Sequence, residues 1–374
     1  MNGRFSVLGI KMKWVIHMKA KHVVDLTDLS HKELTEIIEL ANKIKENPSD
    51  YSEVCKGKIL ATLFYEPSTR TQMSFQTAML RLGGSIIGFD NPQNSSVAKG
   101  ESLKDTITVV GGYTDIIAIR HPLEGTAAAA AMYSPAPVVN AGDGGHLHPT
   151  QTLTDVVTLY NEAGRLDHLC IGLCGDLKNG RTVHSLIKTM ATFKGNRFIL
   201  ISTPELSVPQ YIKDIINASE CSYEEIGSLA EAMPLLDVLY MTRIQRERFA
   251  SEEEYQKQNG VFVLDKKKLK SAKKSMKILH PLPRVDEIDE EVDYDERAKY
   301  FVQTVYGMYG RMALIIKMLE SSEYTPSPRI LSSHPFRCGN PKCITTTEKY
   351  LPHLFTEAGG DMLICKYCDN RKLI

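Results

Sequence analysis

The first half of the chain alternates between short apolar runs and longer helical stretches. Four of the short runs have the length and composition of buried strands: residues 58–65, 85–90, 115–120 and 137–141. Helical stretches separate them at 69–82, 101–112 and 123–133, and the first of these carries apolar residues three and four positions apart, as one face of a helix does. Strands that alternate with helices predict a parallel sheet with helices on both faces.

A second set of the same kind follows a helix predicted at 150–163. Its strands are expected at residues 169–174, 197–202, 237–241 and 277–280. A long helix at about 296–320 has enough apolar residues to pack back across the first half. The predicted fold class is therefore α/β, with two doubly wound parallel-sheet domains.

The length of the chain, 374 residues, is too great for one compact core. Near residue 320 the composition changes to one rich in serine and proline, as in a linker. We therefore divide the chain into an N-terminal tail (1–20), a first domain (21–150) completed by the helix at 296–320, a second domain (151–295), a linker (321–333) and a C-terminal module (334–374).

The C-terminal module holds two cysteine pairs, Cys338-x4-Cys343 and Cys365-x2-Cys368. This spacing is typical of a tetrahedral zinc site in which four thiolates leave no position open for a substrate. Two disulfides or four unrelated thiols are the alternatives, but a chain that is not exported keeps its cysteines reduced. We predict one structural Zn²⁺ per chain, in a small zinc-ribbon-like β domain whose folding depends on the metal.

Charge and hydropathy argue against some classes of partner. Lys and Arg together equal Asp and Glu at 45 each, so the net charge does not favour a nucleic-acid or membrane partner. No apolar run is long enough to span a bilayer. Lysines interrupt the apolar patch in the first twenty residues, which argues against a secretory signal. We expect a cytoplasmic protein.

The start of the helix predicted at 69–82 brings hydroxyl groups and an arginine to the end of a strand. Ser68 occupies the N-cap position, and Thr69, Arg70 and Thr71 follow it. Free backbone N–H groups at a helix start, together with a guanidinium group, favour an anion, and phosphate is the anion that we expect. An ordinary N-cap beside a surface arginine is the alternative.

The other predicted strands also end in basic and polar residues. Because ligands bind at the carboxyl ends of strands in an open α/β sheet, we expect these residues to meet. They are Arg120, His121, His146, His148, Gln151, Arg181, Arg243, Gln245, Arg248, His280 and Arg284. Together they predict an electropositive site for a pair of anionic substrates. The sequence has no P-loop and no Rossmann glycine motif, so a nucleotide cofactor is not indicated.

These motifs closely resemble those of aspartate carbamoyltransferase catalytic chains, in the same order, from about Lys21 to Leu319. They read FYEPSTRTQMSF, VAKGESLKDT, RHP, GDGGHLHPTQTLTD, GDLKNGRTVHSL, LYMTRIQRER and HPLPRVDEI. The segment 280–283 resembles the aspartate-specific members, since ornithine carbamoyltransferases typically have a cysteine at the position of Pro281. The last segment resembles the zinc domain of the separate regulatory chain, without its nucleotide-binding domain. Control by ATP and CTP therefore does not follow from the resemblance.

The resemblance implies transfer of the carbamoyl group of carbamoyl phosphate to the α-amine of L-aspartate, an early step of pyrimidine biosynthesis. It implies that phosphate is held by Ser68, Thr69, Arg70, Thr71 and Arg120. It implies that the carbonyl oxygen is polarised by Thr71, Arg120 and His148. The carbamoyl NH₂ is expected to contact Gln151 and the backbone carbonyls of Pro281 and Leu282.

The aspartate carboxylates are expected to be held by Arg181, Arg243 and Gln245, next to Leu282. Glu66 is expected to be a positioning carboxylate that pairs with an arginine such as Arg181 or Arg248 when the domains close. Family enzymes are trimers in which a neighbouring chain lends a serine to the carbamoyl phosphate site and a lysine to the sites of both substrates. Ser95, with Ser96 as the close alternative, and Lys99 occupy those positions. The zinc domain is expected to bridge catalytic trimers or to buttress one.

Two other functions stay open on the sequence alone. One is carbamoyl transfer to another amine, such as ornithine. The other is a binding protein whose zinc module recognises nucleic acid. The few basic residues and the scarce aromatic residues of the C-terminal module disfavour the second.

Overall fold

The computed structural model describes residues 22–244, 246, 249, 251–320, 333–358 and 362–373. Its first sheet is parallel, in the order β2-β1-β3-β4. The strands are β1 (Ile59–Phe64), β2 (Ser85–Phe89), β3 (Ile116–His121) and β4 (Val138–Asp143). All four lie where the apolar runs predicted them, and the parallel pairing confirms the predicted α/β class.

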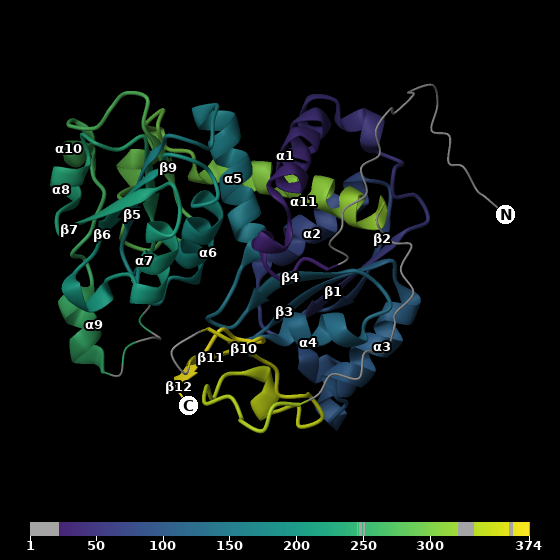
Figure 1. Cartoon of the computed structure of the whole chain (residues 1–374). Helices are drawn as coiled ribbons and strands as arrows, with labels where there is room; N and C mark the ends of the chain where they lie inside the picture. Colours follow the sequence, from purple (N-terminus) through teal and green to yellow (C-terminus); the bar gives the residue numbers. More distant parts are fainter. Residues whose placement is uncertain are drawn as a thin grey trace.

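Helices cover both faces of this sheet because successive strand residues point to opposite sides. Leu60 of β1 packs in the cluster that holds α1 and α2, whereas Ala61 packs in the cluster that holds α3 and α4. Figure 1 shows these two layers above and below the sheet. The helices are α1 (His31–Glu46), α2 (Thr69–Arg81), α3 (Leu103–Tyr113) and α4 (Thr126–Tyr133).

The second sheet is also parallel, in the order β7-β6-β5-β8-β9. Its strands are β5 (Cys170–Cys174), β6 (Arg197–Ile201), β7 (Ser222–Ile226), β8 (Val238–Met241) and β9 (Lys277–Leu279). Strand β7 was not expected, because its exposed edge carries Glu224 and Glu225 rather than an apolar run. The helices of this half are α6 (Arg181–Met190), α7 (Gln210–Asn217), α8 (Leu229–Ala232), α9 (Glu252–Gln258) and α10 (Lys266–Leu269).

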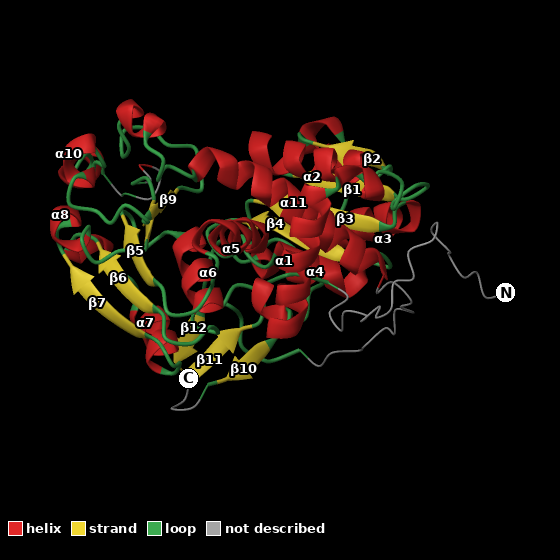
Figure 2. Ribbon diagram, turned by 90° about the horizontal axis from the view of Figure 1, so that it is seen from above, coloured by secondary structure: helices red, strands yellow, loops and turns green. Residues whose placement is uncertain are grey.

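Two long helices join the halves, α5 (Pro149–Ala163) and α11 (Tyr300–Glu320). They lie side by side between the two sheets in Figures 1 and 2. Helix α11 also contacts α1 and α2, so it packs back across the first half as expected. It begins at Tyr300 rather than near 296 because residues 297–299 pair with β9: Ile278 N donates to Arg297 O at 2.8 Å, and Lys299 N donates to Ile278 O at 2.9 Å.

The C-terminal module is a three-stranded antiparallel sheet in the order β10-β11-β12. Its strands are β10 (Phe355–Glu357), β11 (Met362–Cys365) and β12 (Arg371–Leu373). It packs against α3 and α4, where Ile344, Leu351 and Tyr367 share one apolar cluster with the first sheet. Backbone hydrogen bonds fix the contact, since Glu124 N donates to Lys342 O at 2.8 Å and Ile344 N donates to Glu124 O at 2.9 Å.

Gly125 is required where the module meets helix α4. Its φ is +82°, and a Cβ atom there would lie 2.5 Å from Tyr367 Cβ. Gly164, at the end of α5, has φ +72° but no atom within 4 Å of an added Cβ. The two glycines therefore separate the cost of backbone conformation from the cost of a steric clash.

We predict that Gly125→Ala destabilises the protein much more than Gly164→Ala. Both substitutions force a left-handed backbone, which costs about 1–2 kcal/mol, and Gly125→Ala adds roughly 1–3 kcal/mol of overpacking against Tyr367. Scanning calorimetry of the two variants and the unsubstituted protein checks the difference. Equal losses would show that the module does not sit tightly on Gly125.

Candidate functional site

A cleft of about 890 Å³ opens at the carboxyl ends of strands from both sheets. This is the place where open α/β sheets bind ligands. Most of the predicted site residues line it: Glu66, Ser68, Thr69, Arg70, Thr71, Arg120, His148, Gln151, Arg181, Arg243, Pro281 and Leu282. Gln245 and Arg248 lie outside the described residues.

The start of helix α2 points its first turn at the cleft. Ser68 is the N-cap residue, as predicted, but its side chain makes no capping hydrogen bond. The backbone N–H groups of the first turn therefore lack the usual side-chain acceptor. Thr71 is buried beneath the turn, and Arg70 is exposed beside it. Partial burial and then the nearby charges of Arg120 and Arg243 lower the pKa of Arg70.

Arg120, at the end of β3, and His148, at the start of α5, meet deep in the cleft. Arg120 Nη1 lies 3.3 Å from His148 Nε2. Gly142, with φ +122°, lies next to both side chains, and a Cβ atom there would lie 2.9 Å from Arg120 Nη1. Glycine at this position thus lets the guanidinium reach the imidazole.

His148 is a neutral imidazole. Burial, followed by the charges of Arg181, Arg120 and Arg311, lowers its pKa well below the ordinary value. Its Nδ1 accepts the backbone N–H of Gln151 at 3.3 Å, which places the ring proton on Nε2. Since Nε2 is then a donor like Arg120 Nη1, the two groups present a pair of donors to a single oxygen atom.

Asp155 of α5 is a buried acceptor that organises the floor of the cleft. It accepts hydrogen bonds from Gln151 Nε2 at 2.8 Å, Gln303 Nε2 at 2.6 Å and Tyr240 OH at 3.0 Å. Burial raises the pKa of Asp155 to about 7, although these donors and Arg311 act in the opposite direction. Because the amide nitrogen of Gln151 is engaged, its oxygen remains as the acceptor that the cleft can use.

On the opposite wall, His280 holds the backbone of Leu282 in place. Its Nδ1 accepts the N–H of Leu282 at 2.8 Å, and its Nε2 lies 2.6 Å from Glu287 Oε1. Leu282 has a φ of +53°. The carbonyls of Pro281 and Leu282 are therefore fixed at the edge of the cleft by a buried imidazole and carboxylate.

The arginines of the cleft are held by different acceptors. Arg120 Nη2 pairs with Glu66 at 2.5 Å, and Arg181 Nη1 donates to the carbonyl of Gly144. The pairing of Glu66 with Arg181 or Arg248 on domain closure stays a prediction. In this structure Glu66 meets Arg120, because β1 and β3 are neighbours and end side by side. Arg284, grouped with the strand-end arginines, turns away to pair with Asp293.

Two basic lining residues were not predicted. Arg311 of α11 is 4% exposed and donates to Thr154 Oγ1 at 3.2 Å, and burial lowers its pKa to about 10. The feature of the sequence that could have identified Arg311 is a lone arginine in a largely apolar helix. Lys342 reaches the cleft from the C-terminal module, and its position between two zinc-spaced cysteines gave no signal.

The described lining of the cleft is strongly positive. It holds Arg70, Arg120, Arg181, Arg243, Arg311 and Lys342, with Glu66 as its carboxylate. Such a site attracts and holds anions. Ser95 and Lys99 do not line the cleft of the single chain; they lie in an exposed loop where Ser95 Oγ donates to Pro92 O at 2.8 Å.

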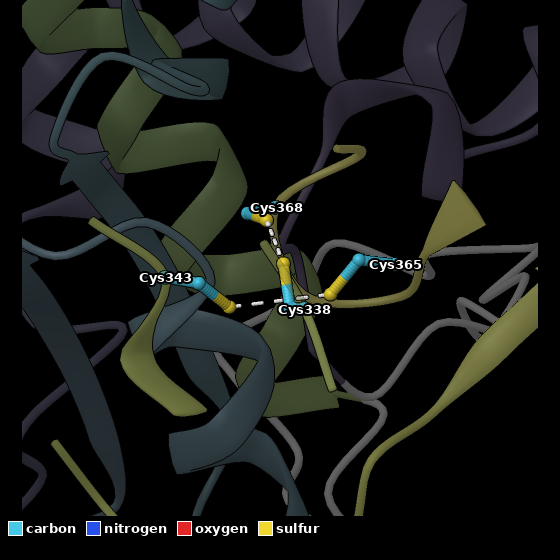
Figure 3. A group of neighbouring side chains, drawn as sticks. All are labelled: Cys338, Cys343, Cys365 and Cys368. Carbon is cyan, nitrogen blue, oxygen red and sulfur yellow. Dashed lines mark hydrogen bonds between the residues drawn. The ribbon is translucent and has the colours of Figure 1, made fainter. Parts of the chain in front are cut away.

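The four predicted cysteine ligands converge in the C-terminal module (Figure 3). Their Sγ atoms all lie within 4.8 Å of one another, and the pairs Cys338–Cys368 and Cys343–Cys365 are separated by 3.6 and 4.0 Å. Tetrahedral Zn–S bonds of about 2.3 Å place thiolates about 3.8 Å apart. Thr345 Oγ1 donates to Cys343 Sγ at 3.2 Å and orients that ligand. The cluster fits a structural zinc ion.

Family models match both halves of the chain. Residues 21–161 match the model described as "Aspartate/ornithine carbamoyltransferase, carbamoyl-P binding domain", and residues 167–318 match its "Asp/Orn binding domain". The chain therefore belongs to the aspartate/ornithine carbamoyltransferase family. Residues 332–372 match "Aspartate carbamoyltransferase regulatory chain, metal binding domain".

Relatives and solved structures place the chain among the aspartate carbamoyltransferases. It is 58% identical over 303 residues to the aspartate carbamoyltransferase catalytic subunit of Clostridium perfringens, covering 81% of this chain and 99% of that protein. The catalytic subunit of M. jannaschii aspartate transcarbamoylase aligns with TM-score 0.76 and 46% identity, over 80% and 98% of the two chains. The Trypanosoma cruzi enzyme, in complex with carbamoyl aspartate and phosphate, aligns with TM-score 0.76 and 36% identity, over 80% and 96%.

These findings favour the aspartate enzyme over the ornithine alternative. No helix in the described parts of the chain is long and apolar enough to cross a membrane.

We predict that purified protein carries one zinc ion per chain and that Cys365→Ser abolishes this binding. The module is too small to fold on its apolar core alone, so zinc loss should also unfold its three-stranded sheet. Metal analysis by mass spectrometry and the thermal unfolding profile measure both effects. Cys170→Ser, a half-buried cysteine outside the cluster, is the matched control and should keep its zinc. Full zinc content in the Cys365 variant would contradict the four-cysteine site.

Proposed function

We propose that this protein transfers the carbamoyl group of carbamoyl phosphate to L-aspartate, forming N-carbamoyl-L-aspartate and phosphate in the cytoplasm. The observation that carries the proposal is a single cleft in which arginines from both halves of the chain face the open start of helix α2. Two anionic substrates repel each other, so a positively charged cleft is needed to hold both in the orientation for reaction. The complexes of the T. cruzi relative contain the same substrates and products.

The phosphate of carbamoyl phosphate would lie at the start of α2. Ser68, Thr69 and Thr71 offer hydroxyl groups there, the first turn offers backbone N–H groups, and Arg70 offers a guanidinium fork. Charge-assisted hydrogen bonds to phosphate are about twice as strong as hydrogen bonds between neutral groups. Negative charge grows on the phosphate as it leaves, so these donors bind the transition state more strongly than the ground state.

The carbonyl oxygen of the carbamoyl group would lie between Arg120 and His148, with Thr71 close by. The amine of aspartate attacks the carbonyl carbon, and negative charge then develops on this oxygen. Arg120 Nη1 and the Nε2–H of His148 are 3.3 Å apart and already fixed, so they stabilise that charge without rearranging. A neutral imidazole donates this hydrogen bond without giving up its proton, as a neutral electrophilic histidine does in other enzymes.

The carbamoyl NH₂ group would donate to Gln151 and to the carbonyls of Pro281 and Leu282. Asp155 engages the Gln151 amide nitrogen, and His280 fixes the N–H of Leu282. The three remaining groups are oxygens, which match a group that can only donate. This set orients the carbamoyl plane toward the incoming amine.

The two carboxylates of aspartate would bind Arg181 and Arg243, with Gln245 beside them. Both arginines line the cleft on the side of the second sheet, and planar guanidinium groups suit carboxylates. Glu66 would position Arg120 in the state seen here. When the two domains close, Glu66 would leave Arg120 and pair with Arg181 or Arg248.

We further propose that the active unit is a trimer in which Ser95 and Lys99 of one chain complete the cleft of the next. Their exposed loop lies away from the cleft of their own chain, as such a role requires. A zinc ion held by the four clustered cysteines would stabilise the module and leave the transfer chemistry to the arginines. The segments 21–150 with α11 and 151–295 would act as the carbamoyl-phosphate and aspartate domains.

We predict that Arg70→Ala lowers kcat/KM by at least about 100-fold, because removing one preorganised donor at a developing charge costs 10²–10³ in rate. Arg81→Ala, on the last turn of the same helix and exposed, should leave the rate unchanged. Steady-state formation of carbamoyl aspartate measures both. Full activity of the Arg70 variant would exclude the phosphate site at α2.

The amine substrate is tested by a panel of amino acids, in which we expect aspartate alone to be carbamoylated efficiently. Arg243→Ala should raise the KM for aspartate more than tenfold, since a charge-assisted pair contributes about 1.5–3 kcal/mol. Arg246→Ala, whose exposed guanidinium pairs with Glu252, is the matched control. A preference for ornithine would overturn the assignment of Arg181 and Arg243.

A further inference from the structure

The C-terminal module contacts both halves of the chain, through two very different surfaces. Against the first half it buries apolar side chains in a shared cluster. Against the second half its described contacts are polar, and they come from the turn that follows Cys368 and from the start of β12. Figures 1 and 2 both show this end of the module directed toward α6 and α7.

Asp369 is the centre of the polar surface. One of its carboxylate oxygens, Oδ2, lies 3.1 Å from His146 Nε2 and 3.3 Å from Lys188 Nζ. The contact with His146 is an ion pair rather than an aligned hydrogen bond. One side chain of the module thus joins a loop of the first half to a helix of the second.

His146 belongs to the loop that carries the catalytic His148. On its other side, His146 Nδ1 lies 3.1 Å from Asp143 Oδ2. Asp143 is buried and also accepts the backbone N–H groups of Gly125 at 2.8 Å and Leu147 at 3.0 Å. Burial alone would lower the pKa of His146, but the two flanking carboxylates raise it to about 10. The loop is therefore held by charges on both sides, one of which comes from the module.

Lys188 lies on α6, the helix that begins with the aspartate-site residue Arg181. Its side chain is 16% exposed and that of Asp369 is 49% exposed, so water screens the pair from the Asp369 side only. A second contact runs in parallel, because the guanidinium of Arg371 lies 5.2 Å from the ring centroid of Tyr211 on α7. Tyr211 OH in turn lies 3.2 Å from Nδ1 of His184 on α6.

From these contacts we infer that the zinc module braces the active site of its own chain, with Asp369 as a positioning residue. Through Asp369, the module sets the separation between the loop carrying His148 and the helix carrying Arg181. The apolar surface anchors the module to the first half, whereas the polar surface can release and re-form without exposing apolar area. The module therefore acts on aspartate binding, which needs both halves, more than on carbamoyl phosphate binding. This inference rests on the proposed function.

The experiment compares Asp369→Ala, Lys188→Ala and the double variant in steady-state kinetics. We expect each single variant to raise the KM for aspartate roughly threefold to thirtyfold, with little change in the KM for carbamoyl phosphate. Because the contact of Lys188 is one of the two that Asp369 makes, the double variant should be no worse than Asp369→Ala alone. Asp369 follows the zinc ligand Cys368, so metal analysis must show whether Asp369→Ala keeps its zinc. Lys188 is far along the chain from the cysteines, so Lys188→Ala tests the brace whatever the zinc content of the Asp369 variant.

Matched controls remove equivalent charges elsewhere. Glu357→Gln takes a carboxylate from an exposed position of the same module, and Lys213→Ala breaks a lysine pair with Glu225 within the second half. Both should keep the KM of the unsubstituted protein.

Hydrogen–deuterium exchange gives a readout that does not depend on activity. The amides of residues 142–148 and of α6 should exchange faster in both single variants than in the controls. Unchanged exchange together with an unchanged KM for aspartate would overturn the brace. If the unsubstituted protein formed no carbamoyl aspartate, the proposed function would fail, and exchange alone would decide whether the brace exists.

Discussion

Mutual repulsion among the arginines is the constraint that the rest of the cleft must satisfy. Among the described residues, five guanidinium groups and a lysine line one space of about 890 Å³, and one carboxylate, Glu66, faces them. Like charges at such range raise the free energy of the empty site. Neutral acceptors reduce this cost, because backbone carbonyl groups accept hydrogen bonds from Arg181 and Arg311. Anionic substrates relieve the remaining repulsion, so the energy stored in the empty cleft favours their binding.

Such a site needs a rigid floor, and the pair of helices α5 and α11 provides it. Asp155 lies at their contact and joins Gln151 of α5, Gln303 of α11 and Tyr240 of the second sheet. One buried carboxyl group thereby ties the floor to the second half, while Arg311 of α11 donates to Ser74 of α2 and ties it to the first. A buried polar network of this kind is stable only when each member finds its partners. Substitution of any one member would leave unpaired groups beneath both substrates.

The sequence predicted what depends on local pattern. Apolar runs located eight of the nine strands of the two large sheets, strand ends located most of the cleft, and cysteine spacing located the metal cluster. Strand β7 escaped because an exposed edge strand with Glu224 and Glu225 has no apolar run. Gln303 and Arg311 escaped because their partners lie about 150 residues away and meet them only once α11 packs on α5. The same holds for the pairing of Glu66 with Arg120, which depends on strand order rather than on spacing.

Fusion of the zinc module to the catalytic chain changes the physics of their contact. Two separate chains would have to lose translational and rotational freedom on docking, whereas a tethered module meets its surface at an effective concentration set by the linker. Weak polar contacts such as those of Asp369 and Arg371 can then persist beside the apolar anchor at Ile344 and Tyr367. The module can thus hold a geometry without a large interface to the second half. A contact of that kind restrains the two halves while still allowing them to move.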